Sequence, residues 1–120
     1  MAVGFDIEAG LVALSLSNEL PEIRIVAVIP FEGMQHRFSA SQRIAFEQII
    51  DKADEVITLA TAYSAGVYAV RNNFLVDNST AVITYFTGEK GGTAYTIKRA
   101  IKSLLQITNI YNNPQKELIF

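Results

Sequence analysis

The feature that most constrains this chain is a continuous β-branched run that ends at a proline. Residues 23–30 read Ile-Arg-Ile-Val-Ala-Val-Ile-Pro, which is the pattern of a strand buried on both faces of a parallel sheet. Similar runs at 55–59 and 81–86 predict two more strands, and 107–111 predicts a weaker fourth. The segments between these strands therefore decide the fold class.

Helical periodicity fills those segments. Apolar residues at i, i+3, i+4 and i+7 predict three amphipathic helices. Their stripes are Phe46, Ile49, Ile50 and Ala53; Val67, Val70 and Phe74; and Ala94, Ile97, Ile101, Leu104 and Leu105. Ser39 or Ser41 is expected to cap the first of them. Strands and helices alternating in this way predict an α/β fold with a mainly parallel sheet, as a single domain over residues 1–120.

A further helix, expected between Asp6 and Pro21, has almost no polar face. Its apolar residues are Ile7, Ala9, Leu11, Val12, Ala13, Leu14 and Leu16. Such a helix is normally buried on more than one side. We therefore expect it to pack against another subunit or against sequence outside this chain. A homo-oligomer is expected, and a two-fold dimer is the commonest form.

Composition excludes several classes of function. A net charge of −2 argues against binding to nucleic acid or to anionic membranes, which need a basic surface. The chain has no cysteine and one histidine, His36, so neither a thiolate site nor a His-rich metal site is expected, and we expect no cofactor. No apolar run is long enough to cross a bilayer. A cytoplasmic location is the resulting expectation.

The loop at residues 87–93, Thr-Gly-Glu-Lys-Gly-Gly-Thr, lies between a predicted strand and a predicted helix. Ligands of open parallel sheets bind at such loops, beyond the carboxyl ends of the strands. Gly91 and Gly92 would let backbone amides approach a phosphate, and Thr93 would add a hydroxyl at the helix N-terminus. The alternative is an ordinary glycine-rich turn.

Other polar residues are weaker candidates by themselves. Asp6 fits a plain helix N-cap. Arg71 and Asn72 are interpreted as solvated residues beside an apolar stripe, and Asp77 begins a turn at a helix end. His36, in the loop at residues 30–38, could act as a general acid or base, although the sequence shows no partner for it.

Five segments in series resemble the YpsA-like family of the SLOG superfamily. These Rossmann-like domains also include DNA-processing protein A and the LOG phosphoribohydrolases. The segments are MAVGFD at 1–6, IRIVAVIPF at 23–31, ADEVI at 53–57, RNNFLVD at 71–77 and GGTAYTI at 91–97. The resemblance implies a Rossmann-like three-layer sandwich that binds a nucleotide or a nucleotide-derived ligand. The positions it matches are Gly4, Asp6, Arg71, Asn72, Asp77, Gly91, Gly92 and Thr93.

Two departures from the family pattern shape the functional expectation. LOG hydrolases resemble P-G-G-x-G-T-x-x-E, with a catalytic glutamate, whereas Thr93 is followed here by Ala-Tyr-Thr-Ile-Lys-Arg-Ala without a carboxylate. Family domains also begin with a strand-helix-strand ahead of the first matched segment, so we expect this domain to be incomplete at its N-terminus.

The resemblance therefore implies noncatalytic binding or sensing of a nucleotide-derived ligand. A second reading is a phosphoribohydrolase-like enzyme that takes its carboxylate from Asp6 or Asp77. A third reading is a fragment that has only an assembly role.

Overall fold

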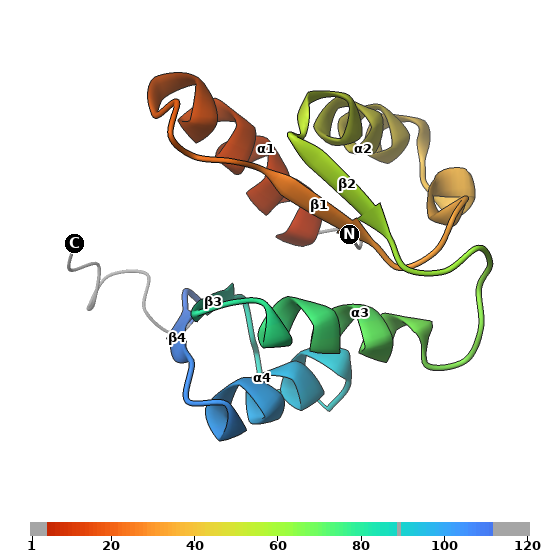
Figure 1. The fold of residues 1–120 in the computed structure, drawn as a ribbon. Helices are drawn as coiled ribbons and strands as arrows, with labels where there is room; N and C mark the ends of the chain where they lie inside the picture. The colour runs from red at the N-terminus through yellow and green to blue at the C-terminus, as the bar shows by residue number, and fades with distance from the viewer. Residues whose placement is uncertain (1–4, 89, 112–120) are drawn as a thin grey trace. The chain divides into compact units, whose positions relative to one another are not determined.

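The same order of elements occurs twice along the chain. The computed structural model describes residues 5–88 and 90–111. By its internal contacts the chain divides into two units, residues 1–67 and 68–120. Each unit contains a helix, a strand, a second helix and a second strand, in that order (Figure 1). Helix α3 begins at the boundary between the units.

In the first unit, a helix connects two parallel strands. The elements are α1 (Phe5–Glu19), β1 (Val26–Ile29), the short 3₁₀ helix η1 (Met34–Arg37), α2 (Ala40–Lys52) and β2 (Glu55–Thr58). β1 and β2 pair in parallel, with Val26 opposite Glu55. The helix connection is what parallel pairing requires, because a tight turn cannot join parallel strands.

The core of the first unit is apolar. Ile7 and Leu14 of α1 pack with Ile49 of α2, whose side chain is only 2% exposed. A second cluster joins Met34 and Phe46 to the end of β1. These contacts fix α1 and α2 against each other.

The second unit repeats the connection on different residues. Its elements are α3 (Val67–Asp77), β3 (Ala81–Thr84), α4 (Gly92–Lys102) and β4 (Gln106–Asn109). β3 and β4 pair in parallel, with Ala81 opposite Gln106. Two contacts show that α3 and α4 lie side by side and run in the same direction: Asn72 lies beside Gly92, and Asp77 pairs with Arg99 further along both helices.

The α/β fold class with parallel strands is confirmed. Each predicted strand forms, and the paired strands make two sheets of two strands each. Three consecutive residues of β1, Ala27, Val28 and Ile29, are buried. Successive side chains of a strand point to opposite faces, so β1 is buried on both faces as its composition predicts.

Two sequence expectations need correction. Leu104 does not continue the apolar stripe of α4, because the helix ends at Lys102 and Leu104 adopts φ 60° with 91% of its surface exposed. Asp6 is not a cap, because α1 already includes Phe5. Val12 and Leu16 of α1 remain exposed within this chain, so the expected packing of α1 against another subunit or further sequence stays a prediction.

No described helix is both long enough and apolar enough to cross a membrane.

Candidate anion-binding site

The loop that enters α4 is anchored where it leaves β3. The side-chain amide of Asn109, at the end of β4, makes two hydrogen bonds with the backbone of Phe86. Asn109 Oδ1 accepts from Phe86 N at 3.0 Å, and Asn109 Nδ2 donates to Phe86 O at 3.0 Å. Thr84 O also accepts a bond from the backbone nitrogen of Ile110 at 3.0 Å. The start of the loop is therefore held to both strands of the sheet.

The other end of the loop is the N-terminus of α4, where the N-cap residue is a glycine. Gly91 is the N-cap residue, with φ 142° and ψ −159°, and it makes no side-chain capping bond. Only glycine adopts this backbone conformation readily. The first three amides of an α-helix, here those of Gly92, Thr93 and Ala94, have no partner inside the helix.

The charge distribution at this end of α4 also suits an anion. The first turn contains no acidic side chain, and the basic residues Arg99 and Lys102 lie in the last turn. A helix N-terminus carries a partial positive charge that attracts phosphate. No carboxylate of this first turn opposes that attraction.

Asn72 of α3 lies beside the N-terminus of α4 with its amide nitrogen on that side. A Cβ placed on Gly92 would be 3.7 Å from Asn72 Nδ2. The other end of the same amide, Oδ1, accepts a hydrogen bond from Arg71 Nε at 2.8 Å. Arg71 thereby fixes the orientation of the amide, and Asn72 presents a donor, not an acceptor, to the start of α4.

Arg71 does not lie in solvent as the sequence suggests. The residue is only 6% exposed, and its guanidinium carbon lies 5.8 Å from the centroid of the Tyr68 ring. A guanidinium at this distance from an aromatic face is attracted by the ring quadrupole. Arg71 is therefore held between Asn72 and Tyr68, and its position depends on packing that sequence periodicity cannot show.

Asp77 lies away from the glycine loop. Its carboxylate pairs with Arg99, whose Nη2 is 2.9 Å from Oδ1 and 3.0 Å from Oδ2. Arg99 follows Gly92 by seven residues, which is about 10 Å along the axis of α4. The structure thus brings Asn72 to Gly91–Thr93, links Arg71 to them through Asn72, and does not bring Asp77 there.

The remaining candidates belong to the first unit. Gly4 is outside the described residues. Asp6 lies in the first turn of α1, where a carboxylate is favourable near the helix N-terminus. His36 is exposed in η1, and its ring packs close to Gly33. A role for Asp6 and Gly4 in binding stays a prediction.

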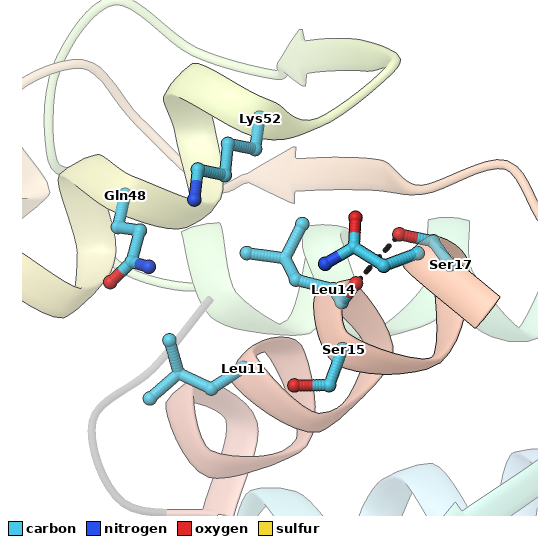
Figure 2. Close-up of a pocket in the computed structure, with 7 residues that line it drawn as sticks. Leu11, Leu14, Ser15, Ser17, Gln48 and Lys52 are labelled. Carbon is cyan, nitrogen blue, oxygen red and sulfur yellow. Dashed lines mark hydrogen bonds between the residues drawn. The ribbon is translucent and has the colours of Figure 1, made fainter.

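A pocket of about 440 Å³ lies between α1 and α2. Figure 2 shows Gln48 and Lys52 of α2 facing Leu11, Leu14 and Ser15 of α1. The hydroxyl of Ser17 donates to the carbonyl of Leu14 at 2.8 Å, so this part of the lining is satisfied within α1. None of the site residues expected from the sequence lines the pocket. Within residues 5–88 and 90–111, no cluster of acidic, histidine or cysteine side chains could hold a metal ion.

Sequence reasoning missed Tyr68 and Asn109. Tyr68 precedes Arg71 by three residues and Asn72 by four, the spacing that places side chains on one side of a helix. That spacing is a signal that could have found it. Asn109 has no such signal, because its contact with Phe86 crosses 23 residues of sequence.

With this geometry described, comparison with known proteins gives the family. The model of the YspA SLOG family, YpsA, matches residues 1–113. The chain belongs to this family. Membership gives the chain a nucleotide-related, Rossmann-like setting and confirms the resemblance on which the site residues were selected.

The chain is also similar to curated Bacillus proteins. It is 25% identical over 116 residues to the SPbeta prophage-derived protein YoqJ of Bacillus subtilis (strain 168), covering 87% of this chain and 68% of YoqJ. It is 25% identical over 112 residues to UPF0398 proteins of Bacillus thuringiensis (strain Al Hakam) and Bacillus cereus (strain Q1), covering 92% of this chain and 61% of each relative. The chain thus spans about three-fifths of the length of these UPF0398 relatives.

Proposed function

We propose that this chain binds a nucleotide-derived ligand without transforming it, and holds the ligand's phosphate at the N-terminus of α4. The observation that carries the proposal is the open end of that helix. Gly91 provides no side-chain cap, and the oriented amide of Asn72 lies beside Gly92. Backbone and side-chain donors therefore converge on one position, where a phosphate could accept several hydrogen bonds.

Binding without chemistry is the preferred form of the proposal because the described residues at the start of α4 include no carboxylate. The first turn of α4 has no acidic residue. Asp77 is a carboxylate that the family motif includes, and both of its oxygens accept hydrogen bonds from Arg99. General acid–base catalysis requires a group within hydrogen-bond reach of the reacting atoms. The donors around Gly92 supply electrostatic binding only.

The proposal is tested by Gly92→Val with adenosine 5′-monophosphate as the probe. A Cβ at this position already reaches van der Waals distance of Asn72 Nδ2, so the two extra methyl groups of valine occupy the space proposed for the phosphate. We expect ligand-induced thermal stabilisation to disappear while the variant remains folded. Scanning calorimetry and isothermal titration measure both quantities.

A matched control comes from the other unit. Ser39→Ala removes the side-chain cap of α2 and should lower stability by about 1 kcal/mol without changing affinity for the nucleotide. Unchanged binding in the folded Gly92→Val variant would overturn the proposed site. Release of free base during the incubation would instead support the phosphoribohydrolase reading.

The dimer expected from the sequence stays a prediction. The observation in its favour is the exposed apolar side of α1, where Val12 is 58% and Leu16 is 44% exposed.

A further inference from the structure

The geometry points to a second binding site in the pocket between α1 and α2, which takes a small carboxylate that has an apolar chain. The pocket lies wholly in the first unit, so this site does not depend on the phosphate site proposed at α4. Its volume of about 440 Å³ falls within the range of about 300–1,000 Å³ that small-molecule sites occupy. The space is therefore sufficient for a small organic molecule, and the lining decides its chemical class.

The charge of the lining favours an anion. Lys52, the last residue of α2, is the charged member of the lining, and the polar members Ser15, Ser17, Asn18 and Gln48 are neutral. Figure 2 shows the Lys52 and Gln48 side chains extending from α2 toward α1. Among the described residues, none forms an ion pair with Lys52. A lysine ammonium has three donors and no acceptor, so the group that Lys52 would hold is an anion.

The opposite wall of the pocket is partly apolar and favours an anion that carries an apolar group. Leu11 and Leu14 of α1 line it; Leu14 is buried and Leu11 is half-buried. Ser15 and Asn18 continue the same side of the helix, at i+4 and i+7 from Leu11. An inorganic anion at Lys52 would leave the exposed part of these leucines in water, whereas an apolar chain attached to a carboxylate would cover it.

The hydrogen-bonding groups of the pocket differ in their availability. The Ser17 hydroxyl already donates to the carbonyl of Leu14 at 2.8 Å. Ser15, Asn18 and Gln48 have no side-chain hydrogen bond to another residue of the described part of the chain. Their hydroxyl and amide groups can therefore donate to a carboxylate that Lys52 holds.

The apolar contact beside the pocket keeps its two walls in place. Ile49 of α2 is 2% exposed and packs with Leu14 of α1. A Cβ on Gly10 would come within 2.7 Å of the Ile49 side chain, so α1 and α2 approach closely at this point. Because this contact fixes one helix against the other, a ligand would bind between walls that are already in position, and little ordering would oppose binding.

The experiment titrates the ¹⁵N-labelled chain with three probes and follows its amide signals by NMR. The probes are octanoate, acetate, which lacks the chain, and octylammonium, which has the chain and the opposite charge. Octanoate, kept at concentrations where it is monomeric, should shift signals of α1 and α2. It should bind at least about tenfold more tightly than either of the other two probes.

Two variants and a matched control assign the binding to this pocket. Lys52→Gln removes the charge and should weaken octanoate binding by about tenfold. Ser15→Phe fills the pocket from an exposed position of α1 and should abolish binding. Lys102→Gln is the control, because Lys102 is also an exposed lysine at the last residue of its helix, in the second unit; it should leave the affinity unchanged. Circular dichroism checks that each variant remains folded.

The remaining outcomes would overturn the site. Equal affinity for octanoate and octylammonium would exclude a role for the charge of Lys52, and equal affinity for octanoate and acetate would exclude the apolar wall. Unchanged octanoate binding in folded Lys52→Gln or Ser15→Phe would place the ligand elsewhere on the chain. Absence of octanoate binding to the wild-type chain would overturn the pocket proposal alone, because the phosphate site at α4 is tested with a nucleotide.

Discussion

The two units have the same order of elements, but the N-terminus of the second helix differs between them. In the first unit, α2 begins with a complete capping box: Ser39 Oγ accepts from Gln42 N, and Gln42 Oε1 accepts from Ser39 N at 2.9 Å. In the second unit, Gly91 is the N-cap residue of α4 and makes no side-chain capping bond. The capping box occupies the amides of Ser39 and Gln42 at the start of α2, whereas the N-cap glycine of α4 has no side chain that could do the same.

The contact between the two helices of each unit also differs: it is apolar in the first unit and polar in the second. α1 and α2 meet through Ile7, Leu14 and Ile49, and a Cβ on Gly10 would come within 2.7 Å of the Ile49 side chain. α3 and α4 meet through Asn72 beside Gly92 and through the Asp77–Arg99 pair. Apolar contact of the first kind contributes strongly to stability, whereas an exposed ion pair such as Asp77–Arg99 contributes little.

The largest expected effect is at the apolar helix contact. Ile49→Ala should lower the free energy of unfolding by about 2–5 kcal/mol, because it leaves a cavity among well-packed side chains. That loss is a large part of the stability of a small domain. Urea unfolding followed by circular dichroism measures it.

Ile44→Ala is the matched control for Ile49→Ala. It makes the same change on the same helix at a residue that is 67% exposed, and it should stay within about 0.5 kcal/mol of wild type. A similar loss of unfolding free energy in the two variants would contradict the conclusion that the buried apolar contact between α1 and α2 stabilises the first unit.

An intermediate effect is expected at Arg71. Arg71→Ala removes the donor to Asn72 Oδ1 and should lower stability by about 1–3 kcal/mol, because a partly buried acceptor is left without its bond. The Asn72 amide then loses its fixed orientation, so affinity for adenosine 5′-monophosphate should fall about tenfold, equivalent to about 1.4 kcal/mol. Urea unfolding and calorimetric titration measure the two losses.

Asn72→Ala shows whether Arg71 acts through Asn72. If Arg71 only positions the amide, the double variant should bind no more weakly than Asn72→Ala alone. A further drop in the double variant would mean that Arg71 contacts the ligand itself. A loss of stability with full affinity would mean that Arg71 serves the fold alone.

Most of the fold could be predicted from the sequence because its signals are local. The β-branched run at residues 23–30 gives a buried strand, and the i, i+3, i+4 stripes give the helices. The Ser39 cap was one of two alternatives, and the structure selects it. Leu104 shows the limit of periodicity, because the stripe continues past the point where the helix ends.

The candidate site was less predictable because its geometry depends on contacts between elements. The glycine pair and its helix were visible as a local pattern. The burial of Arg71, the orientation of the Asn72 amide and the anchoring of Phe86 by Asn109 all come from side chains that meet only in the folded chain. A motif identifies a set of residues, but it does not show which of them would contact a ligand and which would hold the contacting residue in position.

The smallest effect is expected at Asp77, although the family motif includes it. Its pair with Arg99 is largely exposed, with 48% of the Asp77 side chain and 38% of the Arg99 side chain accessible, and exposed ion pairs typically contribute no more than about 1 kcal/mol. Asp77→Asn should therefore lower stability by at most about that amount and leave nucleotide affinity unchanged. Arg99→Gln should match it, and a double-mutant cycle in urea measures the pair itself. A clear loss of affinity in Asp77→Asn with stability preserved would place the carboxylate in the binding site, and would show that the open end of α4 is only part of it.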